Sequence, residues 1–244
     1  MKSRFALIAS ALVLAAGNVA AQSQGDWLVR AGVGFINTDV DSGDLVFEGI
    51  PLEGYQVDVN NNVRPIVNFT WMATDNVGIE LLGAAPFRHG IDGDGALEGL
   101  GRLGNTKHLP PVLSVQWHFM PGNTLRPYAG LGLNYTYFFD ESATDTLHQG
   151  IIGTANAATG SDYAGGSSDL SISNSAGIAL QLGLDVALEN DWFINFDVRW
   201  IDIEADARIT SNTFDGAGQP VTLNSRVKAD LDPWVFSAGV GFRF

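Results

Sequence analysis

The sequence contains no cysteine and little positive charge. Its 244 residues include 13 lysines and arginines against 27 aspartates and glutamates, which gives a formal net charge of −14 at pH 7. Without cysteine there is no disulfide framework and no thiol for metal or redox chemistry. The acidic balance argues against nucleic acid as a partner, because binding to phosphate requires a basic surface.

Long hydrophobic runs are also absent, except at the N-terminus. There Lys2 and Arg4 precede the run FALIASALVLAAG, and small residues follow at Val19 and Ala21. This pattern predicts a secretory signal peptide over residues 1–21. No later run approaches the roughly 18 consecutive apolar residues of a membrane helix. The exported chain, residues 22–244, is therefore either a soluble periplasmic protein or a barrel in the outer membrane of a Gram-negative bacterium.

Eight segments of the exported chain alternate large apolar residues with small or polar ones. The last, PWVFSAGVGFRF (233–244), places Trp234 and Phe236 on one face and Gly239 and Arg243 on the other. A period of two predicts a β-strand with one apolar side. The other seven segments are 27–35, 65–71, 77–87, 109–119, 125–139, 176–186 and 192–200.

Charge and tryptophan are divided between the two faces of these strands. No charged residue falls on the apolar face, and a Lys or Arg facing lipid at the middle of a bilayer costs about 2–4 kcal/mol. A soluble ligand-binding barrel has the same period with the faces reversed. All six tryptophans lie on the apolar face, however, and the interior of an eight-stranded barrel is only just filled by ordinary side chains. The apolar face is therefore predicted to meet lipid.

The connections alternate in length. The gaps at 37–62, 89–107, 140–172 and 203–226 are long, whereas MATDN, MPGNT and LEND are short. This predicts an all-β fold: one eight-stranded, antiparallel, up-and-down transmembrane β-barrel with short periplasmic turns, long extracellular loops and both termini in the periplasm. The loops are rich in Gly, Asp, Ser and Thr, which favours mobility, above all at 153–168.

Four segments carry a family resemblance. WMATDNVGIELLGAAPFRH (71–89), HLPPVLSVQWHF (108–119), RPYAGLGLNYTYFFD (126–140) and LDPWVFSAGVGFRF (231–244) resemble the OmpW family of small outer-membrane proteins, which includes the alkane-uptake protein AlkL. The resemblance implies an eight-stranded barrel with a narrow apolar channel for small hydrophobic molecules. It also implies that Phe244 is the terminal aromatic read by the barrel-assembly machinery. Leu82 matches a position that narrows the channel in the family, but the facing position, often aromatic there, is Arg199 here.

The predicted lumen face changes character along the barrel. We expect a polar floor near the periplasmic end and an apolar path for solutes above it. The floor comprises Arg30, Glu80, Gln116, His118, Arg126, Asp185, Asp197, Arg199 and Arg243. The path comprises Ile36, Ile66, Leu82, Pro110, Val112, Phe138, Ile201, Ile203 and Val235. Opposite charges in a small barrel also pair simply to fill space, and this structural interpretation of the floor is the favoured one.

Prolines suggest where a solute leaves above a closed floor. Pro65, Pro86, Pro110 and Pro111 fall in the outer halves of three consecutive strands. Because proline donates no ladder hydrogen bond, we predict a weakly bonded wall and lateral exit into the bilayer. The alternative is that these prolines only end the sheet where the strands rise above the membrane.

Other chemistry is poorly supported. The four histidines lack zinc spacing and are expected to be hydrogen-bonded lumen side chains, and DVDSGD (39–44) is an incomplete calcium loop, although weak calcium binding by acidic loops stays open. We predict no cofactor and no enzymatic activity; an acyltransferase would have to recruit His89 and Ser173. The main prediction is an outer-membrane channel whose partners are membrane lipid, small hydrophobic solutes and the assembly machinery. The rival is a structural or adhesive surface barrel that serves as a receptor for phage, bacteriocin or a host partner.

Overall fold

Eight strands close into one antiparallel barrel in the computed structural model, which describes residues 21–244. The strands are β1 (Trp27–Asn37), β6 (Asn62–Met72), β7 (Val77–Ala84), β10 (Val112–His118), β11 (Leu125–Ala143), β13 (Ser175–Ala187), β14 (Trp192–Ile201) and β17 (Trp234–Arg243). Each pairs with the next in chain order, and β1 with β17 completes the ring, so the up-and-down topology is confirmed. The predicted signal peptide lies outside the described residues, apart from Ala21.

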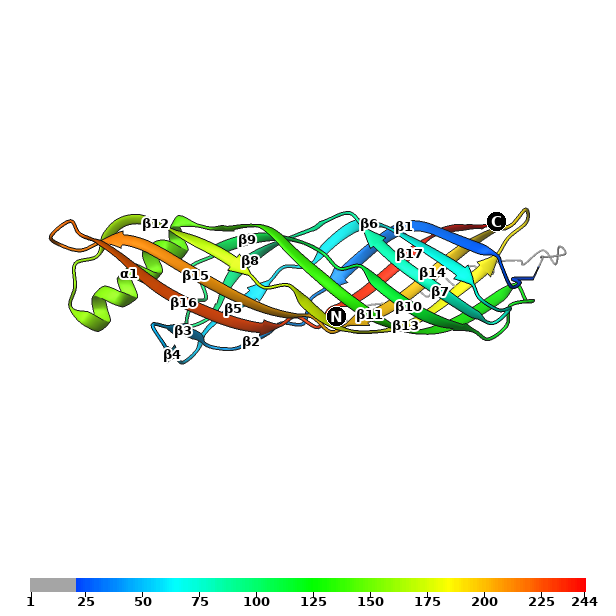
Figure 1. Ribbon diagram of the computed structural model, residues 1–244, viewed down its shortest axis with the longest axis horizontal. Coiled ribbons are helices and arrows are strands. Elements are labelled where there is room, and N and C mark those ends of the chain that lie inside the picture. The colour runs from blue at the N-terminus through cyan, green and yellow to red at the C-terminus, as the bar shows by residue number, and fades with distance from the viewer. Residues whose placement is uncertain (1–20) are drawn as a thin grey trace, which may run out of the picture.

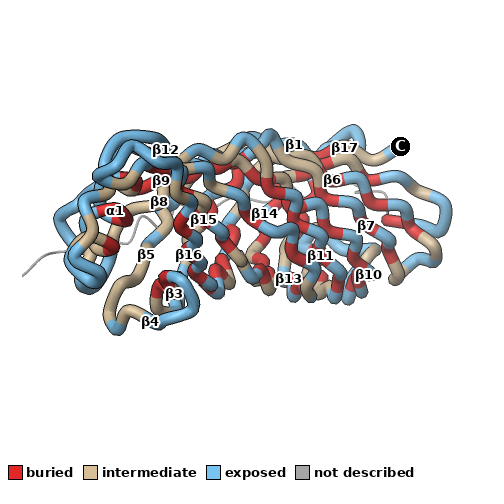
Figure 2. The backbone as a smooth tube through the Cα atoms, turned by 60° about the vertical axis from the view of Figure 1, so that its left-hand side comes forward, coloured by how far each residue is buried: buried red, intermediate tan, exposed pale blue. Residues whose placement is uncertain are grey.

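The two faces of the barrel strands differ as the alternation predicts. Buried and exposed positions follow one another along each strand (Figure 2). Five of the tryptophans are 39–52% exposed on the outer face, and Trp200 is half-buried. Among the residues 21–244, none belongs to a helix that is long and apolar enough to cross a bilayer.

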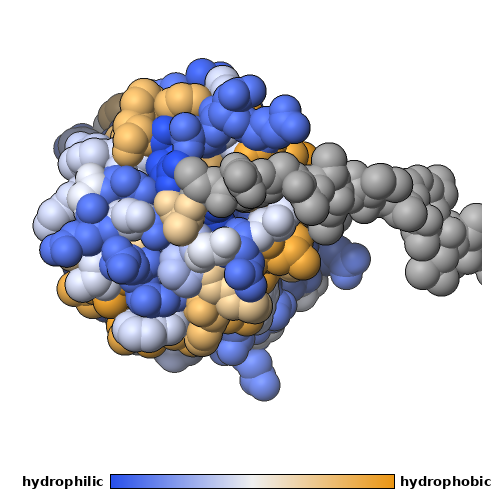
Figure 3. All heavy atoms as spheres, turned by 90° about the vertical axis from the view of Figure 1, so that its right-hand side faces the viewer, coloured by the Kyte–Doolittle hydropathy of each residue, from blue (hydrophilic) through white to orange (hydrophobic). Residues whose placement is uncertain are grey.

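One end of the barrel carries the short turns and the described chain ends, and we call it the terminal end. The turns at 73–76, 119–124 and 188–191 lie there, and the backbone of Phe244 exchanges two hydrogen bonds with Trp27. Seen from this end, the surface that the grey atoms leave visible is mainly hydrophilic, with hydrophobic residues toward its margin (Figure 3).

The long connections build an extension at the opposite, distal end (Figure 1). It contains β2 (Asp41–Ser42), β3 (Leu45–Phe47), β4 (Ile50–Leu52), β5 (Tyr55–Val59), β8 (Phe87–Gly95), β9 (Arg102–Leu109), α1 (Asp145–Thr159), β12 (Ala164–Ile172), β15 (Glu204–Phe214) and β16 (Pro220–Asp230). One layer runs β11-β9-β8-β5 and the other β12-β15-β16-β3-β4, with β2 pairing β16. Apolar side chains from both layers form one buried cluster, which continues into the barrel.

The extension contains far more regular structure than its composition indicated. The segment 153–168, predicted to be mobile, includes the end of α1 and the start of β12. Thr144 caps the helix by accepting a hydrogen bond from the backbone N–H of Leu147, and Gly160 ends it in a left-handed conformation. The strands of the extension also alternate, and their apolar sides stabilise one another by packing across the two layers.

The sequence places Phe87 on the outward face of the third strand, and this is wrong. The ladder of β7 ends at Ala84, and the chain resumes as β8 after Ala85 and Pro86. That interruption reverses the side-chain alternation, so Phe87 is only 2% exposed and points into the molecule.

Candidate functional site: a polar floor beneath an apolar cavity

Two arginines and three carboxylates form the centre of the polar floor. Arg30 pairs with Asp185 (Nη2–Oδ2, 2.7 Å) and with Glu80 (Nη1–Oε2, 3.2 Å). The other oxygen of Glu80 accepts a hydrogen bond from Nη2 of Arg199 at 2.7 Å, and Asp197 lies beside Arg199 at 3.7 Å. All five side chains are nearly inaccessible to solvent, and they come from four strands, so the pairs link opposite walls of the barrel.

Neutral side chains complete the floor, and several of them were not singled out in the sequence. Gln181 donates to Oε1 of Glu80 at 3.1 Å, Tyr128 donates to Asp197 at 3.2 Å, and Asn195 donates to Asp185 at 2.8 Å. Each lies on the lumen face by the same alternation that identifies the charged residues. Parity along the strand was therefore a sufficient signal, and the prediction missed them by attending to charge.

The remaining predicted floor residues lie toward the terminal end. His118 stacks on Tyr128, with the ring centroids 5.2 Å apart, and contacts Gln116 through Nε2 at 3.2 Å. Arg126 is buried and donates to the carbonyl of Asn123. Arg243 is placed at the rim rather than in the floor, because it pairs with Asp191 and Asp26 near the chain ends.

Above the floor, the predicted apolar path is partly closed by packing. Ile36, Leu82, Pro110, Val112, Phe138, Ile201, Ile203 and Val235 are all buried, and Ile66 is partly buried. Ile36 and Ile201 are fully inaccessible, so this part of the lumen is a packed apolar ring. The guanidinium of Arg199 is bound to Glu80 in the floor, and Leu82 is buried and pairs in register with Val112.

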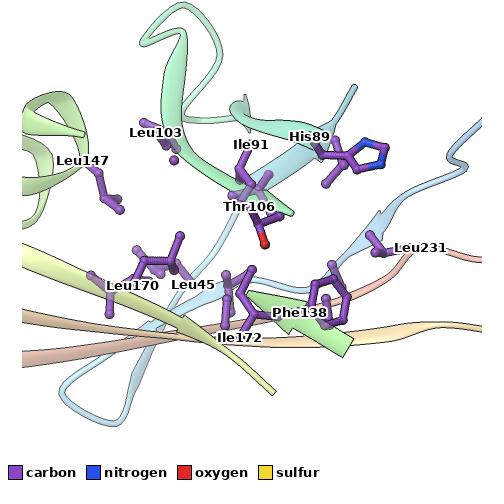
Figure 4. Close-up of a pocket in the computed structure, with 18 of the residues that line it drawn as sticks. Leu45, His89, Ile91, Leu103, Thr106, Phe138, Leu147, Leu170, Ile172 and Leu231 are labelled. Carbon is purple, nitrogen blue, oxygen red and sulfur yellow. The ribbon is translucent and has the colours of Figure 1, made fainter. Parts of the chain in front are cut away.

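An apolar cavity of about 70 Å³ lies beyond this ring, between the two layers of the extension. Twenty residues line it, and only His89, Thr106 and His108 have polar side chains. Figure 4 shows Leu147 and Leu103 at one end of the cavity and His89, Phe138 and Leu231 at the other. His89, Phe138 and Leu231 lie in, or within a few residues of, the barrel strands β7, β11 and β17, so this end of the cavity faces the barrel.

A second cavity adjoins the first beneath α1. It measures about 230 Å³ and shares four lining residues with the first cavity, which are Leu45, Leu97, Leu103 and Leu147. Its other walls come from α1, β3, β4 and β5 and the turn at 96–100. Together the cavities form a largely apolar zone that reaches from α1 to the barrel end of the extension, with Glu98, Thr146 and Thr154 as polar side chains in its outer part. We call it the apolar zone.

Three of the four prolines lie in a gap in the strand ladder. The pairing of β7 with β10 ends at Leu82 and Val112, and that of β8 with β9 begins at Phe87 and His108. The structure describes residues 83–86 and 109–111, and no backbone pairing joins them. We call this unpaired stretch the seam. It contains Pro86, Pro110 and Pro111. Pro65 lies outside the seam, because it keeps its register with Val33 and its carbonyl accepts from the N–H of Ala85.

The other sequence signals do not come together as sites. His89 is buried in the cavity wall, whereas Ser173 is exposed between β12 and β13, so the pair considered for acyl transfer is not assembled. Part of the DVDSGD run forms β2, which pairs with β16. Within the described residues, no three His, Asp or Glu side chains gather as a metal site.

Comparison with known proteins agrees with this architecture. The OmpW family model matches residues 23–244. Outer membrane protein W of Vibrio cholerae is 37% identical over 246 residues, covering 100% of both chains, and outer membrane protein AlkL of Ectopseudomonas oleovorans is 26% identical over 92% of this chain and 85% of its own. The crystal structure of OprG from Pseudomonas aeruginosa superposes with a TM-score of 0.76 at 31% identity, covering 93% of this chain and 99% of that one. The chain is therefore an outer-membrane β-barrel protein that belongs to the OmpW family.

Proposed function

We propose that this protein is a channel that passes small hydrophobic molecules from the outside into the outer membrane. The observation that carries the proposal is the apolar zone of the extension, in which 17 of the 20 residues lining the inner cavity have no polar side chain. Burial of an apolar solute there gains about 25 cal/mol per Å² of surface removed from water. The resemblance to AlkL supports the same solute class.

The exit in this proposal is lateral. The packed ring and the paired floor oppose passage along the barrel axis, for solutes and for ions. The seam begins one residue from His108, which lines the cavity. Pro110 and Pro111 cannot donate hydrogen bonds there, so the wall separates between β7–β8 and β9–β10 without breaking a ladder. Replacing both prolines with valine is expected to slow uptake of an alkane-like solute, and unchanged uptake into vesicles would refute the lateral route.

The cavity itself is tested by filling it. Ala207 lines the cavity and is buried, whereas the next residue, Arg208, is exposed. Ala207→Trp places an indole in the cavity and is expected to abolish most of the protein-dependent uptake of an alkane. Arg208→Trp adds the same side chain to the outer surface and is the matched control. Equal uptake by both variants and the wild type would refute the channel proposal.

In this proposal the terminal end faces the periplasm and the extension faces outward. The chain has no cysteine, so single cysteines report their own exposure. Ala217→Cys, in the exposed β15–β16 turn, is expected to react with an impermeant maleimide in intact cells. Glu189→Cys, exposed at the terminal end, is expected to react only after the outer membrane is broken. The reverse result would invert the orientation.

A surface receptor without transport is the second candidate, and the packed ring favours it. With Ile36 and Ile201 inaccessible, the lumen is filled with side chains as a purely structural barrel would be. The Ala207→Trp experiment separates the two candidates, because a receptor that binds through its outer loops does not depend on the inner cavity.

A further inference from the structure

Two histidines interrupt the apolar wall at the barrel end of the inner cavity. His89 on β8 and His108 on β9 lie diagonally across neighbouring strands, since His89 pairs with Thr106 and His108 with Phe87. Their rings stack with centroids 4.9 Å apart and an interplanar angle of 14°. Both are nearly inaccessible to solvent, at 3% and 2% exposure.

These imidazoles have unused hydrogen-bonding capacity. Nδ1 of His89 lies 2.5 Å from the carbonyl oxygen of Asn60, and because a carbonyl only accepts, Nδ1 carries the proton. Nε2 of neutral His89 is then an acceptor. Neither this nitrogen nor Nε2 of His108 has a hydrogen-bond partner among residues 21–244. Buried polar atoms are almost always paired, so an unpaired couple in a cavity wall is unusual.

The environment of the pair keeps both rings neutral. Burial lowers the pKa of His108 to about 3, with His89 adding a smaller effect of the same sign. Burial also lowers the pKa of His89, and the nearby guanidinium of Arg64 acts in the same direction. A carboxylate in the cavity would therefore meet no counter-charge from the imidazoles and would lose its hydration. An alkane would leave both nitrogens unpaired.

We propose that His89 and His108 form a polar anchor that selects hydrophobic molecules bearing one hydroxyl group, such as a long-chain alcohol or a phenol. A hydroxyl donates one hydrogen bond and accepts two, so it can donate to Nε2 of His89 and accept from His108 in the tautomer that carries its proton on Nε2. The hydrocarbon part lies against the aliphatic wall toward Leu103 and Leu147 (Figure 4). The anchor rests on the proposed channel function and specifies which solutes within that class the channel prefers.

The test compares two ligands that differ only in the group expected to reach the histidines. 1-Naphthol and 1-methylnaphthalene have the same ring system, with a hydroxyl replaced by a methyl group. Affinity for the protein in lipid nanodiscs is measured against empty nanodiscs, which removes the difference in partitioning. The wild type is expected to prefer 1-naphthol by about five- to tenfold, which corresponds to one or two net hydrogen bonds.

Variants then locate the preference. His108→Phe and His89→Phe keep an aromatic ring in the stack and are expected to bring the ratio close to one. Thr106→Val is the control, because it removes the third polar side chain of the cavity, whose hydroxyl already donates to the carbonyl of Lys107. This variant is expected to retain the preference. In ¹⁵N spectra of the wild type, the Nε2 signals are expected to shift with 1-naphthol and not with 1-methylnaphthalene.

The outcomes separate this inference from the channel proposal. Equal binding of both ligands by the wild type would overturn the anchor and leave the channel standing. Specific binding of neither ligand would overturn both. A preference that survives in His89→Phe and His108→Phe, each checked for folding by its gel mobility before and after heating, would also overturn the anchor. The comparison of ligands on the wild type needs no variant, so misfolding cannot leave the question open.

Discussion

Glu80 is the most consequential single side chain of the floor. It is fully inaccessible and accepts hydrogen bonds from four donors: Arg30 and Thr70 at Oε2, both at 3.2 Å, and Arg199 and Gln181 at Oε1, at 2.7 and 3.1 Å. Glu80→Gln keeps the shape but removes the charge and turns one acceptor into a donor that faces other donors. Both arginines lose a buried counter-ion, and Arg30 keeps only Asp185.

The expected loss follows from these contacts. A hydrogen bond to a charged group is worth about 1.5–3 kcal/mol, and the variant loses the two at the substituted oxygen and weakens the two at the other. Removing one partner of a buried ion pair destabilises by about 3–5 kcal/mol. We therefore expect Glu80→Gln to lower the free energy of unfolding by about 3 kcal/mol or more.

The assay is reversible urea unfolding in lipid bilayers, followed by tryptophan fluorescence and by gel mobility. Glu204→Gln is the matched control, because Glu204 makes a single ion pair with Lys228 in which both side chains are more than half exposed. Its stability is expected to stay within about 0.5 kcal/mol of the wild type. If Glu80→Gln is no more destabilising than Glu204→Gln, the floor does not hold the barrel together by charge.

Three further predictions concern other parts of the molecule. Gly183→Ala would put a methyl group 2.1 Å from the ring of Tyr128, and the overpacking is expected to cost about 1–3 kcal/mol and to lower the urea midpoint. Gly153→Ala in α1 meets open space and is expected to leave the midpoint unchanged. An unchanged midpoint for Gly183→Ala would contradict the close approach. Phe244→Ala is expected to reduce the amount of folded protein in cells but not its stability after refolding, because the ring is 71% exposed; full assembly in cells would remove the role assigned to this residue. The pKa of His108 is lowered to about 3 in the folded protein. Below about pH 6.5 the unfolded histidine gains a proton and the folded one does not, so folding of the extension becomes less favourable as the pH falls, down to about pH 3. Hydrogen exchange in β8 and β9, corrected for the intrinsic rate, is therefore expected to speed up between pH 7 and pH 4.5 in the wild type and to change less in His108→Phe.

The barrel was predictable because one physical rule governs it. Each strand must show apolar atoms to lipid and another kind of side chain to the lumen, so the alternation is strict over 27–37, 125–137 or 234–243. The floor residues Arg30, Glu80 and Asp197 could be assigned from parity alone. Arg243 could not, because parity gives the face of a strand and not the height at which a long side chain finds its partners.

The extension was less predictable because its structure depends on contacts between distant segments. Gly- and Asp-rich composition indicated mobile loops, yet Leu170 of β12 and Ile91 of β8 belong to one apolar cluster although they are far apart in the sequence. Thr144 and Gly160 cap α1, but no helix was predicted between them, because a short helix is marginal without facing layers to pack against. Phe87 was misassigned because two residues of irregular chain reverse the alternation.

The barrel and the extension differ in what fills their interiors. In the barrel, charged side chains from opposite walls pair with one another in a floor that is nearly inaccessible to solvent. In the extension, the apolar layers leave space between them, and the three polar side chains that line the inner cavity, His89, Thr106 and His108, lie on β8 and β9. The seam falls where these halves meet, directly below the histidines. A solute bound at His108 would therefore lie beside the seam, where no ladder hydrogen bond joins β7 and β8 to β9 and β10. In the proposed channel, selection and exit would then occur at the same level of the barrel.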